Sequence, residues 1–402
     1  MYRKFLIPAL MFLLFSCEKI SDTGILKFYG DVYEDAGYSL AKTDKGYLIA
    51  GQYTSISRNE GKISGSSRKM ALIRTGINGI ETRLDTLGGK NEASAAKVIS
   101  LEDGTSLVAG TIKNTATGQD IYIARFTADG EGFTEKIFRW PDNQYSTDII
   151  KTSSGFLLLG TTDREYGTTG NKKGKKDFLL LGLNNMLDSV RSTQWGFDKN
   201  DEGAALKQEK EGEYVVVGTT EFDAAGLKDI YIFKVRSDLS TISSRLIEGD
   251  GTEMAADFEI VSDGYIIAGN SSMGGTQAAH IWKVPLSYLI PGNSGGSKTT
   301  EDHAIVLEPN EDNPRPFIVN AMCRYKTSSF ILAGQYGNAS GGDMLIFAVD
   351  ANGYPDYGRI RKAGGTGSQA AYDVITDGDD IIATGKNSYE NNSMITLMKF
   401  RF

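Results

Sequence analysis

Short apolar runs that end in glycine recur seven times along the chain. The runs are rich in β-branched and aromatic residues, and turn pairs such as Asp263-Gly264 and Asp377-Gly378 precede them. Runs of this length are too short for helices and predict buried β-strands. They cover residues 46–51, 106–110, 156–160, 214–218, 265–269, 330–334 and 381–385. Their final glycines lie 59, 50, 58, 51, 65 and 51 residues apart, a spacing that indicates a repeat architecture.

Each repeat contains further strands around this run. In the second repeat the predicted strands cover residues 95–101, 106–112, 120–126 and 133–140. The third strand usually begins with an aspartate, and we expect these carboxylates to accept hydrogen bonds from loop amides. The aspartates are Asp120, Asp177, Asp229 and Asp343. Four antiparallel strands in a repeat of about fifty residues predict a propeller blade rather than a solenoid turn.

The N-terminal strand supplies the strand that the last repeat lacks. The last repeat, residues 370–402, has only three strands, and residues 25–29 form an outer strand without a repeat of its own. Pairing the two completes a seventh blade and removes the exposed ends of an open array. The predicted fold is therefore an all-β, seven-bladed β-propeller over residues 25–402. Its blades are four-stranded and antiparallel, and the N-terminal strand closes the ring in the last blade.

The N-terminus has the pattern of an export signal. Arg3 and Lys4 precede an apolar run, residues 5–15, that is too short to span a bilayer stably. Residues 14–17 (LFSC) resemble a bacterial lipobox, which implies cleavage before Cys17 and lipidation of its thiol. An ordinary secretory signal with a chance cysteine is the alternative.

This resemblance divides the chain into a signal peptide over residues 1–16, a lipidated tether over 17–24 and the propeller. Diacylglycerol and an N-acyl chain together anchor a protein stably to a membrane. Glu18 rather than aspartate follows the cysteine, so analogy with lipoprotein sorting favours the outer membrane. The analogy does not distinguish the periplasmic side from the cell surface.

Composition narrows the classes of function. The net charge of −8 and pI near 5.1 argue against nucleic-acid binding, which requires a basic face. The remaining cysteine, Cys323, lies in an apolar strand pattern, where we expect a small buried hydrophobe. Residues 292–296 (GNSGG) match the sequence around a catalytic serine. They lie in a Gly/Ser-rich insertion, and the chain offers only His280 and His303 as a base, so we expect no catalysis there.

Polar residues recur just ahead of the inner strands. They are Asp35, Glu92, Gln144, Glu202, Glu253 and Gln369. On a propeller they would ring one mouth of the central channel and weakly bind a divalent cation, or a cationic group on a partner. Calcium is favoured among metals because all ligands are oxygens. The alternative is a solvated polar rim.

One segment also imitates a calcium-binding loop. Asp198, Asn200 and Glu202 alternate ahead of Gly203, as ligands do in an EF-hand. No helices are predicted to flank the segment, so a simple turn is the alternative.

The repeats resemble those of lipoproteins from Bacteroidetes-type bacteria. The resemblance rests on the strand at residues 46–51 (GYLIAG), the Asp-led third strands and the Leu87-Gly88-Gly89 junction. It implies the propeller fold and export, but it is no guide to activity, because propellers host both enzymes and scaffolds.

The expected function is binding. The longer connections between second and third strands share one face with the inter-blade connections, and we call it the long-loop face. We expect a non-catalytic cell-envelope scaffold that binds other envelope proteins or a glycan through this face, including the role of accessory subunit in an outer-membrane complex. The alternative is an extracellular polymer-active enzyme, a glycan hydrolase or lyase, with carboxylates at the propeller mouth.

Overall fold

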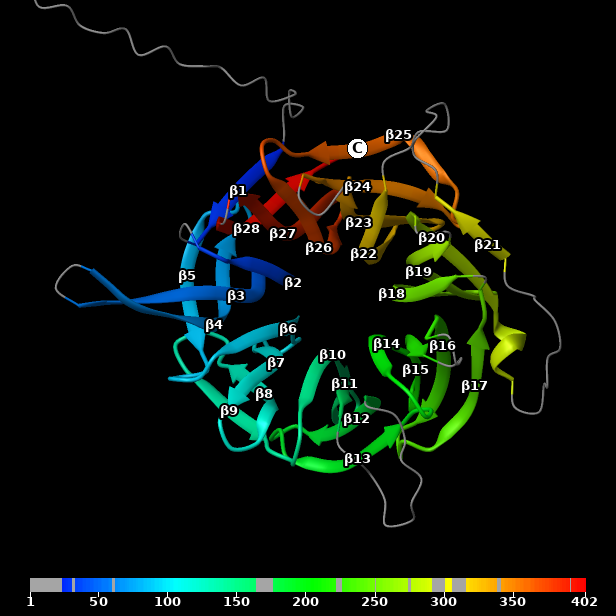
Figure 1. Cartoon of the computed structure of the whole chain (residues 1–402), viewed down its shortest axis with the longest axis horizontal. Helices are drawn as coiled ribbons and strands as arrows, with labels where there is room; N and C mark the ends of the chain where they lie inside the picture. Colours follow the sequence, from blue (N-terminus) through cyan, green and yellow to red (C-terminus); the bar gives the residue numbers. More distant parts are fainter. Residues whose placement is uncertain are drawn as a thin grey trace, which may run out of the picture.

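The fold is a closed ring of seven β-sheets around a central axis (Figure 1). The computed structural model describes residues 24–30, 33–59, 62–163, 176–221, 226–249, 251–273, 276–290, 301–305, 316–337, 341–390 and 392–402. In these ranges each sheet has four antiparallel strands, which confirms the predicted seven-bladed propeller. No helix in this part of the chain has the length and apolar character needed to cross a membrane.

The first four blades follow the chain order without interruption. Blade 1 contains β2 (Ala36–Thr43), β3 (Gly46–Asn59), β4 (Lys62–Gly76) and β5 (Glu81–Leu87). Blade 2 contains β6 (Ala93–Ser100), β7 (Ser106–Asn114), β8 (Gly118–Phe126) and β9 (Phe133–Phe138). Blade 3 contains β10 (Gln144–Thr152), β11 (Gly155–Thr162), β12 (Asp177–Asn184) and β13 (Ser189–Trp195). Blade 4 contains β14 (Asp201–Lys210), β15 (Glu213–Glu221), β16 (Lys228–Arg236) and β17 (Thr241–Ile247).

The last three blades include the closure. Blade 5 contains β18 (Thr252–Val261), β19 (Gly264–Met273), β20 (Thr276–Pro285) and β21 (Glu301–Ala304), with a 3₁₀ turn at Leu286–Leu289 in its insertion. Blade 6 contains β22 (Phe317–Tyr325), β23 (Ser329–Tyr336), β24 (Asp343–Asp350) and β25 (Pro355–Ala363). Blade 7 contains β26 (Ser368–Asp377), β27 (Asp380–Tyr389), β28 (Asn392–Phe400) and, from the other end of the chain, β1 (Ile25–Tyr29).

The N-terminal strand closes the ring, as predicted. Ile25 pairs with Lys399 and Tyr29 with Ile395 in an antiparallel register. The Tyr29 hydroxyl donates to the carbonyl oxygen of Gly79 in blade 1 at 2.6 Å. The strand therefore completes blade 7 and also touches its neighbour.

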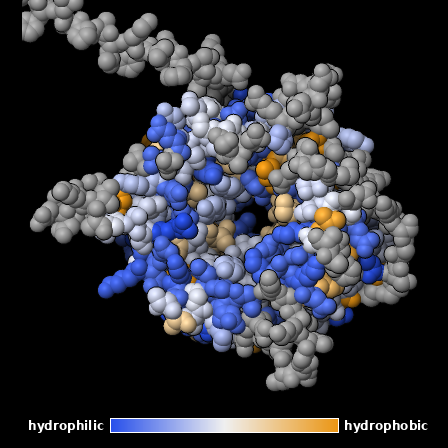
Figure 2. All heavy atoms as spheres, in the orientation of Figure 1, coloured by the Kyte–Doolittle hydropathy of each residue, from blue (hydrophilic) through white to orange (hydrophobic). Residues whose placement is uncertain are grey.

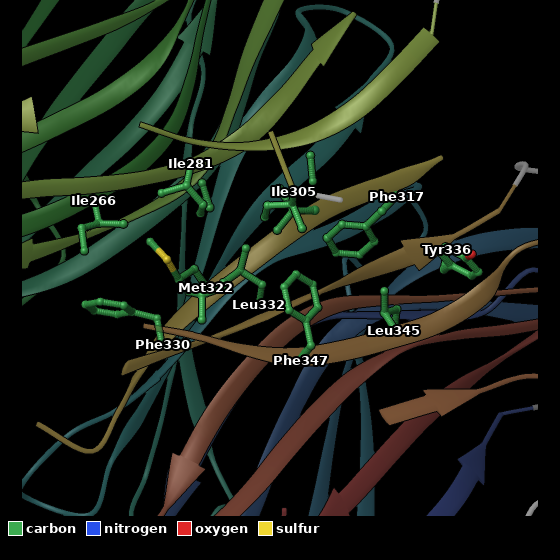
Figure 3. Packing of buried hydrophobic residues seen from close by; sticks show 14 residues of the cluster. Ile266, Ile281, Ile305, Phe317, Met322, Phe330, Leu332, Tyr336, Leu345 and Phe347 are labelled. Carbon is green, nitrogen blue, oxygen red and sulfur yellow. The ribbon is translucent and has the colours of Figure 1, made fainter. Parts of the chain in front are cut away.

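Each interface between neighbouring blades has its own hydrophobic core. Seven clusters of buried side chains occupy the seven interfaces of the described chain. Between blades 5 and 6, Ile281 packs with Met322 and Phe347 (Figure 3). The cluster between blades 7 and 1 is the smallest of the seven, and it contains Tyr29. Closure therefore depends on fewer apolar contacts than any other interface.

Every inner strand carries a β-bulge at the same place. In blade 1 the register shifts between Gly37 and Ser39, and the other six inner strands shift at the equivalent position. The residues at the bulges are Tyr38, Ala96, Thr147, Ala204, Ala256, Asn320 and Tyr372. A bulge takes one residue out of the ladder and bends the strand locally.

Four side chains just after the bulges bind seven backbone amides. Asp148, Asp257 and Asp373 each accept the next N–H of their own strand with Oδ1 and an N–H of the following blade with Oδ2. Ser39 Oγ accepts an N–H of blade 2. The amides belong to Leu40, Val98, Ile149, Leu206, Phe258, Met322 and Val374, one from each blade. Each inner strand is the edge of its sheet, so the N–H groups on its free side have no partner strand and need such acceptors. We call these four side chains the bulge latches.

One stretch predicted as a loop is ordered strand. One of the longer connections predicted between second and third strands, residues 54–68, continues as a β-hairpin in which Ser55 pairs with Ser67 and Asn59 with Lys62. The hairpin extends outward from the ring (Figure 1). The sequence did not predict this hairpin, because its residues are mostly polar on both faces. Strands are recognised in a sequence by an alternation of apolar and polar residues.

Candidate functional site

The predicted ring of polar residues divides into two kinds of position. Asp35, Gln144, Glu253 and Gln369 are buried. In the strand register each stands two residues before the residue opposite the glycine of the second strand. In blades 2 and 4 that position belongs to Ala93 and Asp201, so Glu92 and Glu202 lie one residue away from the ring. The strand register therefore makes four of the six predicted side chains equivalent, with Asp201 as a fifth, and leaves Glu92 and Glu202 outside the set.

The buried members bind nearby backbone. Asp35 accepts the N–H of Thr54 at 2.6 Å, and Glu253 accepts the N–H of Gly251 at 3.2 Å. Gln144 donates to the carbonyl of Pro141 and Gln369 to that of Thr366. Burial also raises the pKa of Glu253. Gln144, Glu253 and Gln369 thus anchor inter-blade connections to the inner strands, whereas Asp35 binds the second strand of its own blade.

The Asp-led third strands have a related role. Asp229 accepts the N–H of Gly249 at 3.2 Å, which confirms the predicted bond to a loop amide. Asp177 and Asp201 both approach Gly196, where a Cβ would lie 2.2 Å from one carboxylate and 2.5 Å from the other. Only glycine leaves room for two carboxylates there. Burial, with a contribution from Asp177, raises the pKa of Asp201 to about 6.

This elevated pKa predicts a pH-dependent effect of Asp201→Asn. The unfolded chain has an aspartate pKa near about 4, so the native state binds the extra proton, and stability falls as pH rises from about 4 through 6. The amide cannot ionise and can still accept the N–H of Phe197, which Asp201 accepts at 2.7 Å. We expect the variant to be more stable than wild type by about 2 kcal/mol at pH 8 and similar to it at pH 4.

Melting curves across this pH range, with Asp198→Asn as the control for the same loop, measure the effect. A stability difference that is the same at both pH values would show that the carboxyl group does not titrate in this range.

In the predicted calcium loop, Asn200 and Glu202 bind other side chains. Asp198 is exposed, and the Asn200 amide donates to Glu221 at 2.8 Å. Glu202 is paired with Lys176 and Lys228. Burial raises the pKa of Glu202, but these two lysines outweigh burial and hold it below its ordinary value. Over the described residues no three His, Cys, Asp or Glu side chains are grouped to hold a metal ion.

The channel wall also carries charges. Lys207 Nζ lies 2.7 Å from Glu259 and 3.5 Å from Asp257. Lys97 Nζ lies 3.9 Å from Asp373, which raises the pKa of Lys97 with help from Asp148 and Asp257. Lys97 belongs to blade 2 and Asp373 to blade 7, so this pair reaches past blade 1. Figure 2 shows a hollow at the centre of the ring. The two lysines are therefore paired with carboxylates of other inner strands.

A polar cleft opens at the closure between blades 7 and 1. Its volume is about 680 Å³, and it lies where β2 begins and β27 turns into β28, on the long-loop face. Tyr38 and Tyr372, the bulge residues of these two blades, line it. Their ring centroids are 5.4 Å apart and the rings are tilted by 50°. Both rings are half-buried, and burial raises the pKa of both hydroxyls.

A second pocket of about 300 Å³ lies next to this cleft, and Arg68 lines both. Tyr145 of blade 3 lines its far part, with the Lys176 ammonium 6.0 Å from the ring centroid. We call the two together the inter-blade groove. Its described lining contains three basic and three acidic residues, namely Arg68, Lys113, Lys386, Glu34, Glu92 and Glu390.

Comparison with known proteins identifies the fold alone. No family model and no curated protein matches the chain. Among solved structures, the β-propeller domain of the Trilobed protease from Pyrococcus furiosus is similar, with a TM-score of 0.50 and 10% identity over 92% of this chain and 94% of that one. That domain is described as having an open velcro topology, whereas here β1 pairs with β28.

Pyrococcus horikoshii acylaminoacyl peptidase is similar at a TM-score of 0.50 and 10% identity, over 91% of this chain and 52% of that protein. The present chain thus spans about half the length of that peptidase. Sqt1 from Chaetomium thermophilum gives a TM-score of 0.47 at 9% identity, over 89% of this chain and 83% of that one. At identities this low, structural similarity shows the propeller fold and gives no information about activity.

The two cleft tyrosines were missed in the sequence. They stand at the same distance before the strand-ending glycines, Gly51 and Gly385, of the first and last repeats. The first and last repeats become neighbours only when the ring closes. The predicted ring at the channel mouth included only acidic and amide side chains. The signal was therefore present but required the ring to be closed first.

Proposed function

We propose that this chain is a lipid-anchored cell-envelope protein that binds its partners, without catalysis, through the long-loop face of the propeller. The observation that carries the proposal is the cleft at Tyr38 and Tyr372 on that face. The rigid inner strands of two blades hold both rings, so little conformational entropy is lost on binding. Ligand sites in proteins are usually concave, and binding residues are commonly held by a rigid scaffold.

Membrane attachment is the second part of the proposal. It rests on the lipobox-like sequence ending at Cys17, which lies outside the described residues together with the tether to position 23. The first described strand, β1, is the outer strand of blade 7. An anchor at Cys17 would therefore hold the propeller by its closure blade.

Site-specific photo-crosslinking in cells tests both parts. A photoreactive amino acid at Asn392, which is exposed and lines the cleft, is expected to form adducts with envelope components. The matched position, Glu102 in the β6–β7 turn of the opposite face, is expected to form none. Cys17→Ala is expected to move the protein out of the membrane fraction and to reduce the adducts.

Equal labelling from both positions, or none from either, would refute the binding face. A Cys17→Ala protein that stays with membranes would refute the anchor alone.

A further inference from the structure

We propose that the inter-blade groove binds a neutral oligosaccharide whose sugar rings stack on Tyr38 and Tyr372. This inference rests on the proposed function, since it names the ligand class of the same face. The argument has four parts: the fixed rings, the polar groups around them, the balance of charge, and the length of the groove.

The two rings form a prearranged platform. The Tyr38 hydroxyl donates to Gln52 Oε1 at 3.5 Å, and Gln52 Nε2 donates to the carbonyl of Glu34 at 2.9 Å. Both tyrosines follow directly from buried inner-strand residues, Gly37 and Ala371. A pyranose ring presents C–H groups on its faces, and these weakly positive groups fit the negative face of an aromatic ring.

Polar groups surround the platform. Gln52, Ser388 and Asn392 line the cleft beside the rings. A sugar carries hydroxyls around its rim, and each one that leaves water needs a hydrogen-bond partner. Amide and hydroxyl side chains can both donate and accept, as sugar hydroxyls require.

Charge balance favours a neutral ligand. Glu34 lies 3.8 Å from Arg68, and Glu92 lies 3.2 Å from Lys113. An anionic or cationic chain would meet as many like charges as opposite ones in this lining. The apolar side chains of the described lining are alanines apart from the tyrosine rings, so the groove offers no deep pocket for the large apolar anchors of a peptide.

The extent of the groove favours a chain of sugars over a single one. Beyond Arg68 the second pocket adds about 300 Å³ and a third tyrosine, Tyr145. Several rings can therefore occupy the groove at once, each adding a weak contact to the total affinity.

Calorimetric titration of the purified full chain tests the proposal. The probes are five neutral hexasaccharides: cellohexaose, xylohexaose, mannohexaose, laminarihexaose and maltohexaose. Hexagalacturonate and an unstructured peptide pool serve as charged and polypeptide comparisons. We expect at least one neutral hexasaccharide to bind, and to bind more tightly than either comparison.

Variants assign the binding to the platform. Tyr38→Ala and Tyr372→Ala are each expected to weaken binding about tenfold, whereas Tyr38→Phe, which keeps the ring, changes it less than about threefold. Tyr357→Ala removes an exposed tyrosine from β25 of blade 6 as the matched control. Asn392→Trp should block the cleft without altering the platform, and this exposed position keeps the test valid if the alanine variants unfold.

Absence of binding by all five neutral hexasaccharides overturns the proposal, as does binding that both Tyr→Ala variants and Asn392→Trp leave unchanged. Tighter binding of the peptide pool or of hexagalacturonate also overturns it. Adducts at Asn392 in cells together with failure of the glycans would reject the oligosaccharide and leave the binding face standing.

Discussion

Removal of β1 is expected to lower the melting temperature of the propeller by roughly 5–10 °C. A chain that begins at Asp31 loses the five backbone pairings with β28 and the buried ring of Tyr29. Truncation of a buried aromatic side chain alone costs about 3–5 kcal/mol. The loss falls on the smallest of the seven interface cores, and it exposes β28 as an open sheet edge.

Thermal melts of this form and of a chain beginning at Gly24 make the comparison. A synthetic peptide of residues 25–30 added to the shortened chain should restore much of the lost stability by pairing with β28, and a scrambled peptide should not. Equal melting temperatures for the two chains would show that the ring is held without its N-terminal strand.

Asp373→Ala is expected to destabilise the protein by about 4 kcal/mol. Asp373 is a buried bulge latch that binds the N–H groups of Leu40 and Val374, each at 2.8 Å. Alanine leaves both amides without an acceptor, and a buried unsatisfied group costs about 1–3 kcal/mol. It also removes the carboxylate that lies 3.9 Å from Lys97 of blade 2.

Denaturant unfolding of a matched set measures this effect. Asp373→Asn keeps one acceptor oxygen and should lose about half as much stability. Ala321 occupies the same position in blade 6, and in blade 5 the equivalent Asp257 binds an N–H of the following blade. Ala321→Asp should therefore supply an acceptor for Val374 and partly rescue Asp373→Ala. A loss below about 1 kcal/mol for Asp373→Ala would show that the latches do not support closure.

The fold was predictable because each blade repeats the same local pattern. The apolar runs ending at Gly51 through Gly385 encode buried second strands whose partners lie nearby in sequence. Closure was also predictable, since residues 25–29 formed a strand without a repeat and the last repeat lacked one. These inferences required only hydrophobic periodicity and the physical cost of an open sheet edge.

The predicted site residues were less accurate, because the hydrophobic pattern does not reveal the longer β6–β7 turn of blade 2 or the second register shift, between Gln208 and Lys210, in blade 4. Glu92 and Glu202 were chosen because each is an acid just ahead of small residues, but the strand register gives the equivalent position to Ala93 and Asp201. A shift of one residue exchanges an exposed side chain for a buried one. The acids expected to face the channel mouth are therefore partly loop anchors and partly surface ion pairs.

The sequence by itself determined the repeat, the number of blades and the strand that closes the ring, because these follow from local patterns of apolar and polar residues. Only the tertiary structure decided the cleft and the latches. Ser39 and Asp373 are 334 residues apart and meet at 3.1 Å, and Tyr38 meets Tyr372 beside them. The physical reason is that these contacts exist only after seven blades have packed into a ring, so no local pattern in the chain encodes them.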